Sequence, residues 1–201
     1  MSYVLGCIVC YLLGAVPFSV LFSRGMLHKD VRRYGSGNPG TSNMTRAFGI
    51  KYGLLVLLFD MAKGFGAVYL GQWIMGPLGA YLGALCAVAG HNWPIYLKFK
   101  GGKGVAVGGI MSIMVDWRCG IAVFAAFLIF AAISKYVSLG SIMGAAAFPS
   151  SLVFFTDFSS RQDVTTLIIA ILVAVLIIFL HRKNIVRIVT GKESRLSFKK
   201  K

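Results

Sequence analysis

Acidic side chains are scarce in this chain of 201 residues, which contains only six Asp and Glu residues. Enzymes that transfer phosphorylated alcohols with a metal ion bind that ion through several carboxylates, and this sequence has too few to build such a site. The GxSxG, HExxH and HxxxxD patterns are also missing, which argues against serine hydrolases, zinc peptidases and the acyltransferases that carry such a box. We therefore expect no metal site and no cofactor.

Charge of either sign is also rare, since 13% of the residues are charged and 57% are hydrophobic. A soluble domain has about a quarter charged residues. Here the apolar residues form long runs, which predicts an all-α integral membrane protein. The net charge of +15 does not indicate nucleic-acid binding, because the basic residues cluster between the apolar runs, where they would face anionic membrane lipid.

The N-terminus lacks the basic residues that begin a cleavable signal peptide. The apolar run over 2–22 is also longer than a typical signal-peptide core, so we interpret it as a retained first span with its N-terminus outside. Cys7, Cys10 and Cys86 lie within apolar runs. We expect them to pack between helices rather than to bind a metal ion or carry redox chemistry.

Windows of about 20 apolar residues predict seven transmembrane helices in a single polytopic membrane domain over residues 1–201. The fourth window is short, so we expect a tilted helix or a re-entrant start there. Five spans is the main alternative, obtained if 104–134 is divided differently. Gly79 and Gly83 have the spacing that lets helix backbones approach closely. The predicted spans lie near 2–23, 53–71, 77–97, 104–115, 118–134, 138–156 and 164–181.

The distribution of basic residues predicts the orientation of these spans. With a periplasmic N-terminus and a cytoplasmic C-terminus, 18 of the 21 Lys and Arg residues lie in the cytoplasm. The basic tail over 182–201 contributes to this count. Only Arg118 and Arg161 then fall outside, and Lys63 lies within a span. The opposite orientation would reverse the count.

Polar and glycine-rich residues are concentrated in three segments, 34–46, 90–104 and 181–193, and the predicted orientation places all three in the cytoplasm. In the first, glycines permit close backbone approach, hydroxyl and amide groups donate, and a helix beginning near Asn43 adds its dipole. A loop needing only flexibility would not need an arginine one turn into that helix, so we expect phosphate binding. The candidate ligands are Ser36, Gly37, Asn38, Gly40, Asn43 and Arg46.

The second segment places lysines on both sides of paired glycines, so that cations and backbone N–H groups converge on a small volume. It lacks the spacing of a Walker A loop but can bind phosphate by the same physics. A single histidine at the end of a span, such as His91, is more often structural. Asp60 and Lys63, three apart in an earlier span, are expected to form a buried ion pair. The candidate ligands here are His91, Lys100, Gly101, Gly102, Lys103 and Gly104.

The third segment follows the last predicted span and contains His181, Arg182, Asn184 and Glu193. A cytoplasmic excess of positive charge explains its arginine, but not its histidine, asparagine or glutamate. Two anion-binding loops without a metal cluster indicate either one large polyphosphate or two separate phosphate-bearing substrates.

These segments together resemble the motifs of the bacterial acyl-phosphate:glycerol-3-phosphate acyltransferase family. The likeness covers nearly the whole chain in order, spacing and length. Ser42 and Val107 stand where the family usually has threonine, without loss of a charge or a glycine. The matching stretches are Ser36-Gly37-Asn38-Pro39-Gly40 with Asn43, Gly90-His91 through Phe99-Lys100-Gly101-Gly102-Lys103-Gly104, and His181-Arg182-x-Asn184-Ile185 with Gly191-x-Glu193.

The resemblance implies a multi-pass enzyme of the bacterial inner membrane with seven helices and an active site at the cytoplasmic face. It would transfer a fatty acyl group from acyl-phosphate to the sn-1 hydroxyl of glycerol 3-phosphate, giving lysophosphatidic acid and phosphate in the first step of phospholipid synthesis. An acyl-phosphate is already activated, which lessens the need for a covalent nucleophile. We expect the protein to act as a monomer.

Roles for individual residues follow from the resemblance. The loop around Lys103 would hold one phosphate, and the first segment would hold the other, assisted by the third and by Ser141. The sequence leaves open which loop takes which substrate. Candidates for the general base are His181, His91, Glu193 and a substrate phosphate oxygen. The residues expected to be catalytic are His181, Asn184, Ser36 and Lys103.

Two other functions compete with this hypothesis. A transporter of small anions or lipid phosphates would place polar residues near the bilayer midplane of several helices, where this sequence has little beyond Asp60 and Lys63. A non-catalytic scaffold with a basic cytoplasmic face would tolerate Lys103→Ala and Asn184→Ala, whereas an enzyme would lose its activity while staying folded.

Overall fold

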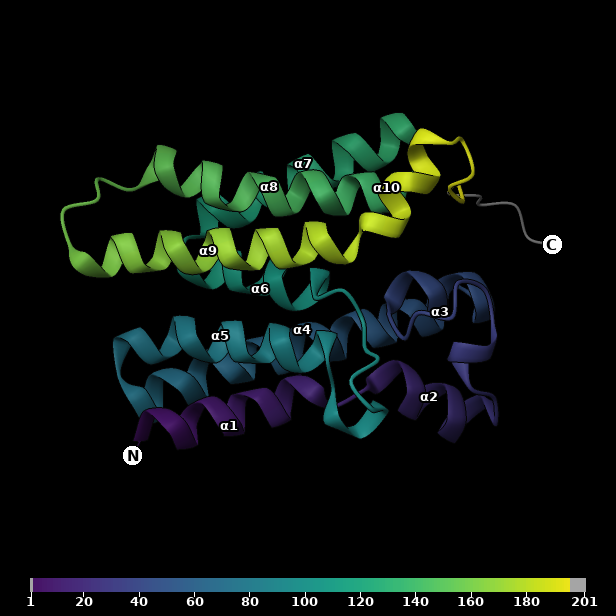
Figure 1. The fold of residues 1–201 in the computed structure, drawn as a ribbon, viewed down its shortest axis with the longest axis horizontal. Helices are drawn as coiled ribbons and strands as arrows, with labels where there is room; N and C mark the ends of the chain where they lie inside the picture. The colour runs from purple at the N-terminus through teal and green to yellow at the C-terminus, as the bar shows by residue number, and fades with distance from the viewer. Residues whose placement is uncertain (1, 196–201) are drawn as a thin grey trace. The chain divides into compact units, whose positions relative to one another are not determined.

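The computed structural model describes residues 2–195, and every regular element in that range is helical (Figure 1). Met1 and residues 196–201 lie outside the described residues, and with them the three lysines that end the basic tail. The chain forms two compact units, Met1–Met111 and Ser112–Lys201.

The first unit is built around three helices that pack against one another, α1, α4 and α5 (Figure 1). The shorter helices of this unit lie between α1 and α4 or follow α5. In chain order its elements are α1 (Ser2–Ala15), α2 (Phe18–Leu27), the 3-10 helix η1 (Val31–Arg33), α3 (Thr41–Phe48), α4 (Ile50–Met75), α5 (Pro77–Asn92), the 3-10 helix η2 (Ile95–Leu97) and the first residues of α6 (Val105–Val115).

Glycines allow α4 and α5 to pack with their backbones in contact. A side-chain carbon on Gly71 would overlap the carbonyl oxygen of Gly79, and one on Gly83 would overlap the carbonyl oxygen of Ala67. Close backbone packing of this kind is a common way for membrane helices to associate. It confirms the small-residue packing predicted for Gly79 and Gly83.

The first predicted span is interrupted, because Ala15 ends α1 and Phe18 begins α2. Pro17 lacks a backbone N–H and its ring clashes with the preceding turn of a helix. The N–H of Val20 bonds to the Pro17 oxygen at 3.0 Å. The Val16 oxygen, four residues before Val20, accepts instead from the N–H of Phe18 at 3.2 Å and so lies outside the helical ladder.

A small apolar cluster supports the polar loop between α2 and α3. Val20 of α2, Val31 of η1, Met44 of α3 and Val56 of α4 are each at most 3% exposed and form one core. Burial of these side chains stabilises the start of the loop against two helices.

The second unit contains α7 (Trp117–Ser134), α8 (Val137–Phe155), α9 (Arg161–Leu180) and α10 (Arg182–Val189), with α8 packed against both α7 and α9 (Figure 1). At one end, Arg118 donates a hydrogen bond of 3.2 Å to the Phe155 oxygen. At the other end, Ser138 donates one of 2.9 Å to Glu193. The segment after α9 therefore lies at the end of the unit where α8 begins.

Within residues 2–195, five helices are long and apolar enough to cross a membrane. In the predicted span over 77–97 the α-helix ends at Asn92, because Pro94 prevents it from continuing. The apolar helix α6 has only 11 residues, and α5, which the sequence predicted to span, has 16. The five spans are Ser2–Leu27, taken through its interruption, Ile50–Met75, Trp117–Ser134, Val137–Phe155 and Arg161–Leu180.

Candidate active site

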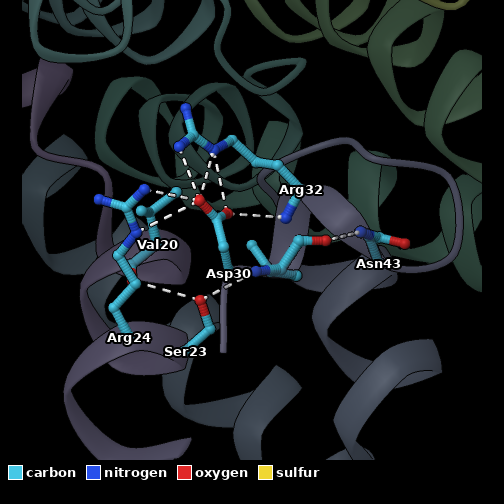
Figure 2. Close-up of polar contacts among 7 residues, drawn as sticks. Val20, Ser23, Arg24, Asp30, Arg32 and Asn43 are labelled. Atoms are coloured by element: carbon cyan, nitrogen blue, oxygen red, sulfur yellow. Dashed lines mark hydrogen bonds and ion pairs between the residues drawn. The ribbon is translucent and has the colours of Figure 1, made fainter. Parts of the chain in front are cut away.

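The first polar loop starts from a carboxylate that two arginines hold (Figure 2). Asp30 Oδ2 lies 2.7 Å from Nη2 of Arg24 and 2.7 Å from Nη2 of Arg32. The Arg32 side chain, together with its backbone N–H and Arg24, holds the pKa of Asp30 well below its usual range. Ser23 Oγ accepts from the N–H of Val31 at 3.1 Å and ties α2 to the loop. Sequence analysis did not identify this network, because no periodicity relates Arg24 to Asp30.

Asn43 shapes the loop from within. Its side chain is 2% exposed, and its Oδ1 accepts from the Ser36 N–H at 2.8 Å. Its Nδ2 donates to the oxygens of Val31 at 3.1 Å and Tyr34 at 3.0 Å. Because both N–H bonds of the carboxamide are used by the protein, this arrangement favours a role in holding the loop over direct contact with a substrate.

The other candidates of the first segment lie around this frame. Ser36 and Arg46 are exposed, and the aliphatic part of Arg46 passes beside Gly35. Gly37 has a φ of +71°, which favours glycine. The helix predicted to begin near Asn43 begins at Thr41, two residues earlier, so Asn38 and Gly40 lie in the loop before it. The exposed hydroxyl and guanidinium groups thus sit beside a loop of fixed shape.

The second polar loop folds back on the end of α5. The N–H groups of Gly101 and Gly102 donate to the oxygens of Asn92 at 3.1 Å and His91 at 2.9 Å. A side-chain carbon on Gly102 would overlap Nε2 of His91, and one on Gly101 would overlap the His91 oxygen. Gly104 has a φ of +74°. Glycine is therefore needed at these positions for contact and for backbone conformation.

This loop leads directly into the N-terminus of α6. Val105 begins the helix, and its first hydrogen bond runs from the N–H of Gly108 to the oxygen of Gly104 at 2.8 Å. The amides of the first turn and the helix dipole favour an anion at this end. Lys100 is exposed and Lys103 is half-buried, so two cations flank the same stretch of backbone.

A buried charge cluster lies beneath the second loop. Lys63 Nζ is 2.9 Å from Asp60 Oδ1, which confirms the predicted ion pair. His91 Nδ1 is 3.6 Å from the same oxygen, a contact that the sequence did not indicate. All three side chains line a small pocket into which both polar loops contribute. Its other lining residues are Ala15, Val16, Pro17, Phe18, Pro39, Pro94, Leu97, Gly101 and Gly102.

In the second unit, His181 is fixed between α9 and α10. Its ring is 3% exposed, and Nδ1 lies 2.8 Å from the oxygen of Ile177. A carbonyl oxygen can only accept, so Nδ1 carries a proton, and in the neutral ring Nε2 is then the acceptor. This tautomer suits a group that takes or orients a proton.

Glu193 binds three side chains at the C-terminal end of the described chain. It accepts hydrogen bonds from Ser138 at 2.9 Å, Asn184 at 2.8 Å and Arg187 at 2.7 Å. Burial alone would raise its pKa, but the hydrogen bonds from Arg187, Asn184 and Ser138 outweigh burial and lower the pKa. A carboxylate held in this way is a weak base near neutral pH and acts as a clamp. Ser138 was not singled out from the sequence, and Arg187 was included only as one basic residue of the third segment.

The remaining candidates of this unit bond to nearby backbone. Ser141 is 5% exposed and donates to the Val137 oxygen at 2.9 Å. Arg182 is exposed, donates to the Phe179 oxygen at 3.2 Å and lies over the Phe179 ring at 4.5 Å. Among residues 2–195, His, Cys, Asp and Glu side chains form no group of three that could hold a metal ion.

Comparisons with known proteins agree with the motifs. The family model described as glycerol-3-phosphate acyltransferase matches residues 4–191. A glycerol-3-phosphate acyltransferase of Thermoanaerobacter sp. (strain X514) is 38% identical over 199 residues, covering 99% of this chain and 98% of the relative. Glycerol-3-phosphate acyltransferase 2 of Moorella thermoacetica is 40% identical over 198 residues, covering 96% of this chain and 97% of the relative.

Two crystal structures of PlsY, an integral membrane glycerol 3-phosphate acyltransferase, share the fold. The glycerol 3-phosphate form has a TM-score of 0.89 at 34% identity, and the lysophosphatidic acid form has a TM-score of 0.84 at 35% identity. Each similarity covers 98% of this chain and 96% of the PlsY chain. This all-α, multi-pass membrane protein therefore belongs to the family of PlsY-type glycerol-3-phosphate acyltransferases.

Proposed function

We propose that this protein transfers a fatty acyl group from acyl-phosphate to the sn-1 hydroxyl of glycerol 3-phosphate, giving lysophosphatidic acid and phosphate. The observation that carries the proposal is the likeness, over 98% of the chain, to PlsY in a glycerol 3-phosphate form and a lysophosphatidic acid form. These two molecules are the acceptor and the product of the reaction. The acyl-phosphate donor fits a chain with two anion-binding loops.

The second loop is the better defined of the two phosphate sites. The N–H groups of Gly101 and Gly102 hold the loop against α5, while the N-terminus of α6 and Lys103 offer positive charge to a phosphate. In the first loop, Ser36 and Arg46 are exposed beside backbone that Asn43 fixes, which suits a second phosphate. Holding two reactants in place and stabilising the oxyanion that forms at the acyl carbon would supply most of the rate.

His181 and Asn184 are proposed as the catalytic residues of the third segment. The Nδ1–Ile177 contact presents His181 Nε2 as an acceptor, whereas Glu193 is held as a weak base. Among the protein groups this favours His181 as the general base. A phosphate oxygen of the substrate, with its second pKa of about 6, is the alternative acceptor for the hydroxyl proton.

We also propose seven membrane crossings with a periplasmic N-terminus and cytoplasmic motifs. In the second unit, the Arg118–Phe155 contact and the Ser138–Glu193 contact lie at opposite ends of α8, as this topology requires. A helix of the length of α6 rises only about 16 Å, against a hydrocarbon core of about 30 Å. The proposal therefore places the loop before α6 within the depth of the membrane, where protein must surround it.

The test is an acyl-transfer assay on the protein purified in detergent. Radiolabelled glycerol 3-phosphate is offered in parallel with palmitoyl-phosphate, palmitoyl-CoA or palmitoyl carrier protein. Lysophosphatidic acid formed from palmitoyl-phosphate alone, without added metal, supports the function and its donor. Product from the thioesters would overturn the donor. No product from any donor, in protein shown to be folded, would instead favour the transporter hypothesis.

A further inference from the structure

We propose that Asp60 and Lys63 are positioning residues for the second phosphate-binding loop, acting through His91. The proposal rests on the proposed function, because it concerns how that loop is kept in the shape that binds a substrate phosphate. Neither side chain is required to touch the substrate.

Stability alone is a poor explanation for these charges. Asp60 is 3% exposed, Lys63 is 4% exposed and both lie within the long apolar helix α4. Removing two charges from water costs about as much as their attraction returns, and an apolar pair of similar size often serves equally well. Ionisable residues at such positions are more often functional.

The pair joins three separate parts of the first unit. Lys63 Nζ donates to the Val16 oxygen at 2.9 Å, at the interruption between α1 and α2. The same ammonium contacts Asp60 Oδ1 at 2.9 Å, and that oxygen lies 3.6 Å from His91 Nδ1 at the end of α5. The Val16 carbonyl, at the interruption between α1 and α2, is therefore connected through α4 to the start of the second loop.

His91 transmits this arrangement to the loop through both its backbone and its ring. Its carbonyl oxygen accepts the Gly102 N–H at 2.9 Å. Its Nε2 lies against Gly102, where no side-chain carbon could fit. Because Nδ1 faces Asp60, the opposite edge of the ring faces the glycine. The carboxylate thereby sets the ring orientation, and the ring sets how closely the loop packs on α5.

Removing the carboxylate should release the ring and loosen the loop without removing any phosphate ligand. The consequence is weaker binding of the substrate whose phosphate the loop holds. General destabilisation has a different signature, since it lowers the fraction of active enzyme and hence kcat, with both KM values unchanged.

The experiment measures kcat and both KM values for Asp60→Asn, Lys63→Met and the double variant Asp60→Asn/Lys63→Met. Gly102→Ala, which disturbs the same contact from the loop side, identifies the substrate that the loop binds. Lys103→Ala is a second reference if Gly102→Ala does not fold. Asp116→Asn, which breaks an ion pair with Arg118 in the other unit, is the matched control and should leave both KM values unchanged.

We expect Asp60→Asn to raise about tenfold the same KM that the reference variant raises, which is the effect of losing one charged contact. The other KM should stay within about twofold. The double variant buries no unpaired charge, so it should regain the melting temperature of the unchanged protein while keeping the raised KM. A fall in kcat alone, or a double variant that also regains the KM, would overturn the proposal.

A binding measurement separates this proposal from the proposed function. If the unchanged protein forms no lysophosphatidic acid, the proposed function fails on its own. Inorganic phosphate should still raise the melting temperature of the unchanged protein, and should not raise that of the double variant. An equal rise in both proteins, or none in either, overturns the positioning role.

Discussion

At the scale of single residues, the clearest dependence is that of the first loop on the Asn43 carboxamide. Asn43→Ala removes three hydrogen bonds, those of Ser36, Val31 and Tyr34. Asn43→Asp keeps the shape but turns a carboxylate oxygen toward two carbonyl oxygens. We expect at least about a tenfold loss of kcat/KM for the alanine variant and a larger loss for the aspartate variant, since buried unmatched polar groups cost most.

Acyl transfer in detergent measures this loss, and a melting curve shows how much of each variant is folded. Ser42→Ala is the matched control, because Ser42 is the exposed neighbour of Asn43 in α3. Full activity in Asn43→Asp would show that the loop does not depend on the two donated hydrogen bonds.

A second residue-scale prediction concerns pH and Glu193. Its pKa in the folded protein lies below the ordinary 4.5, so the clamp contributes full stability above that value. The contribution is lost as the pH falls through the folded pKa. Glu193→Gln should therefore lower the melting temperature near neutral pH, with a difference that shrinks as the pH falls below the ordinary pKa of 4.5. Asp157→Asn, at an exposed carboxylate, should have no effect at any pH, and a difference for Glu193→Gln that is constant with pH would contradict the clamp.

Single residues also show what a sequence can and cannot predict. The Asp60–Lys63 pair was predictable. Side chains three residues apart lie on the same face of a helix, and opposite charges in an apolar run are stabilised by pairing. The contact of Asp60 with His91 was not predictable, because it depends on how α4 packs against α5. The same holds for Ser138 and Glu193, which lie far apart in the chain.

At the scale of elements, hydropathy located the long helices but not their interruptions. The predicted span over 118–134 differs by one residue from α7. The continuous helix over 2–23 was wrong, since Pro17 sits in an apolar run and interrupts it without changing its hydropathy. The span over 77–97 ran past Asn92 for a related reason. In both places a proline, which lacks a backbone N–H, ends the α-helix, and a hydropathy window does not register this effect.

Packing of α4 on α5 makes a testable prediction at this scale. In Gly71→Ala the new methyl group would overlap the carbonyl oxygen of Gly79, which is backbone and cannot move without separating the helices. In Gly66→Ala, on the same helix, it would meet only the tip of Leu13, 3.3 Å away. We expect Gly71→Ala to destabilise the protein by about 1–3 kcal/mol, as overpacking does, and Gly66→Ala by much less. Melting in detergent tests this, and equal melting temperatures would contradict close contact of the two backbones.

At the scale of the whole molecule, the distribution of charge carries information that no single motif holds. Basic residues concentrate in the segments that also carry the glycine-rich and polar motifs. Together with the predicted spans, that coincidence led to the prediction of one functional face. It could not predict the number of crossings, because α5 and α6 are short for a full span and charge counts do not measure helix length.

The proposed topology predicts which cysteines, introduced at serine positions, a membrane-impermeant thiol reagent can label in intact cells. Ser159→Cys, in the exposed segment between α8 and α9, should be labelled because that segment faces the periplasm. Ser42→Cys and Ser194→Cys are exposed on the protein too, but should be labelled only after the membrane is opened. The unchanged protein, whose four cysteines are buried or half-buried, gives the background. Labelling of Ser194→Cys in intact cells would contradict a cytoplasmic C-terminus. Labelling of Ser42→Cys with protection of Ser194→Cys would contradict the proposed number of crossings, because the chain would then cross the membrane an odd number of times between the two positions.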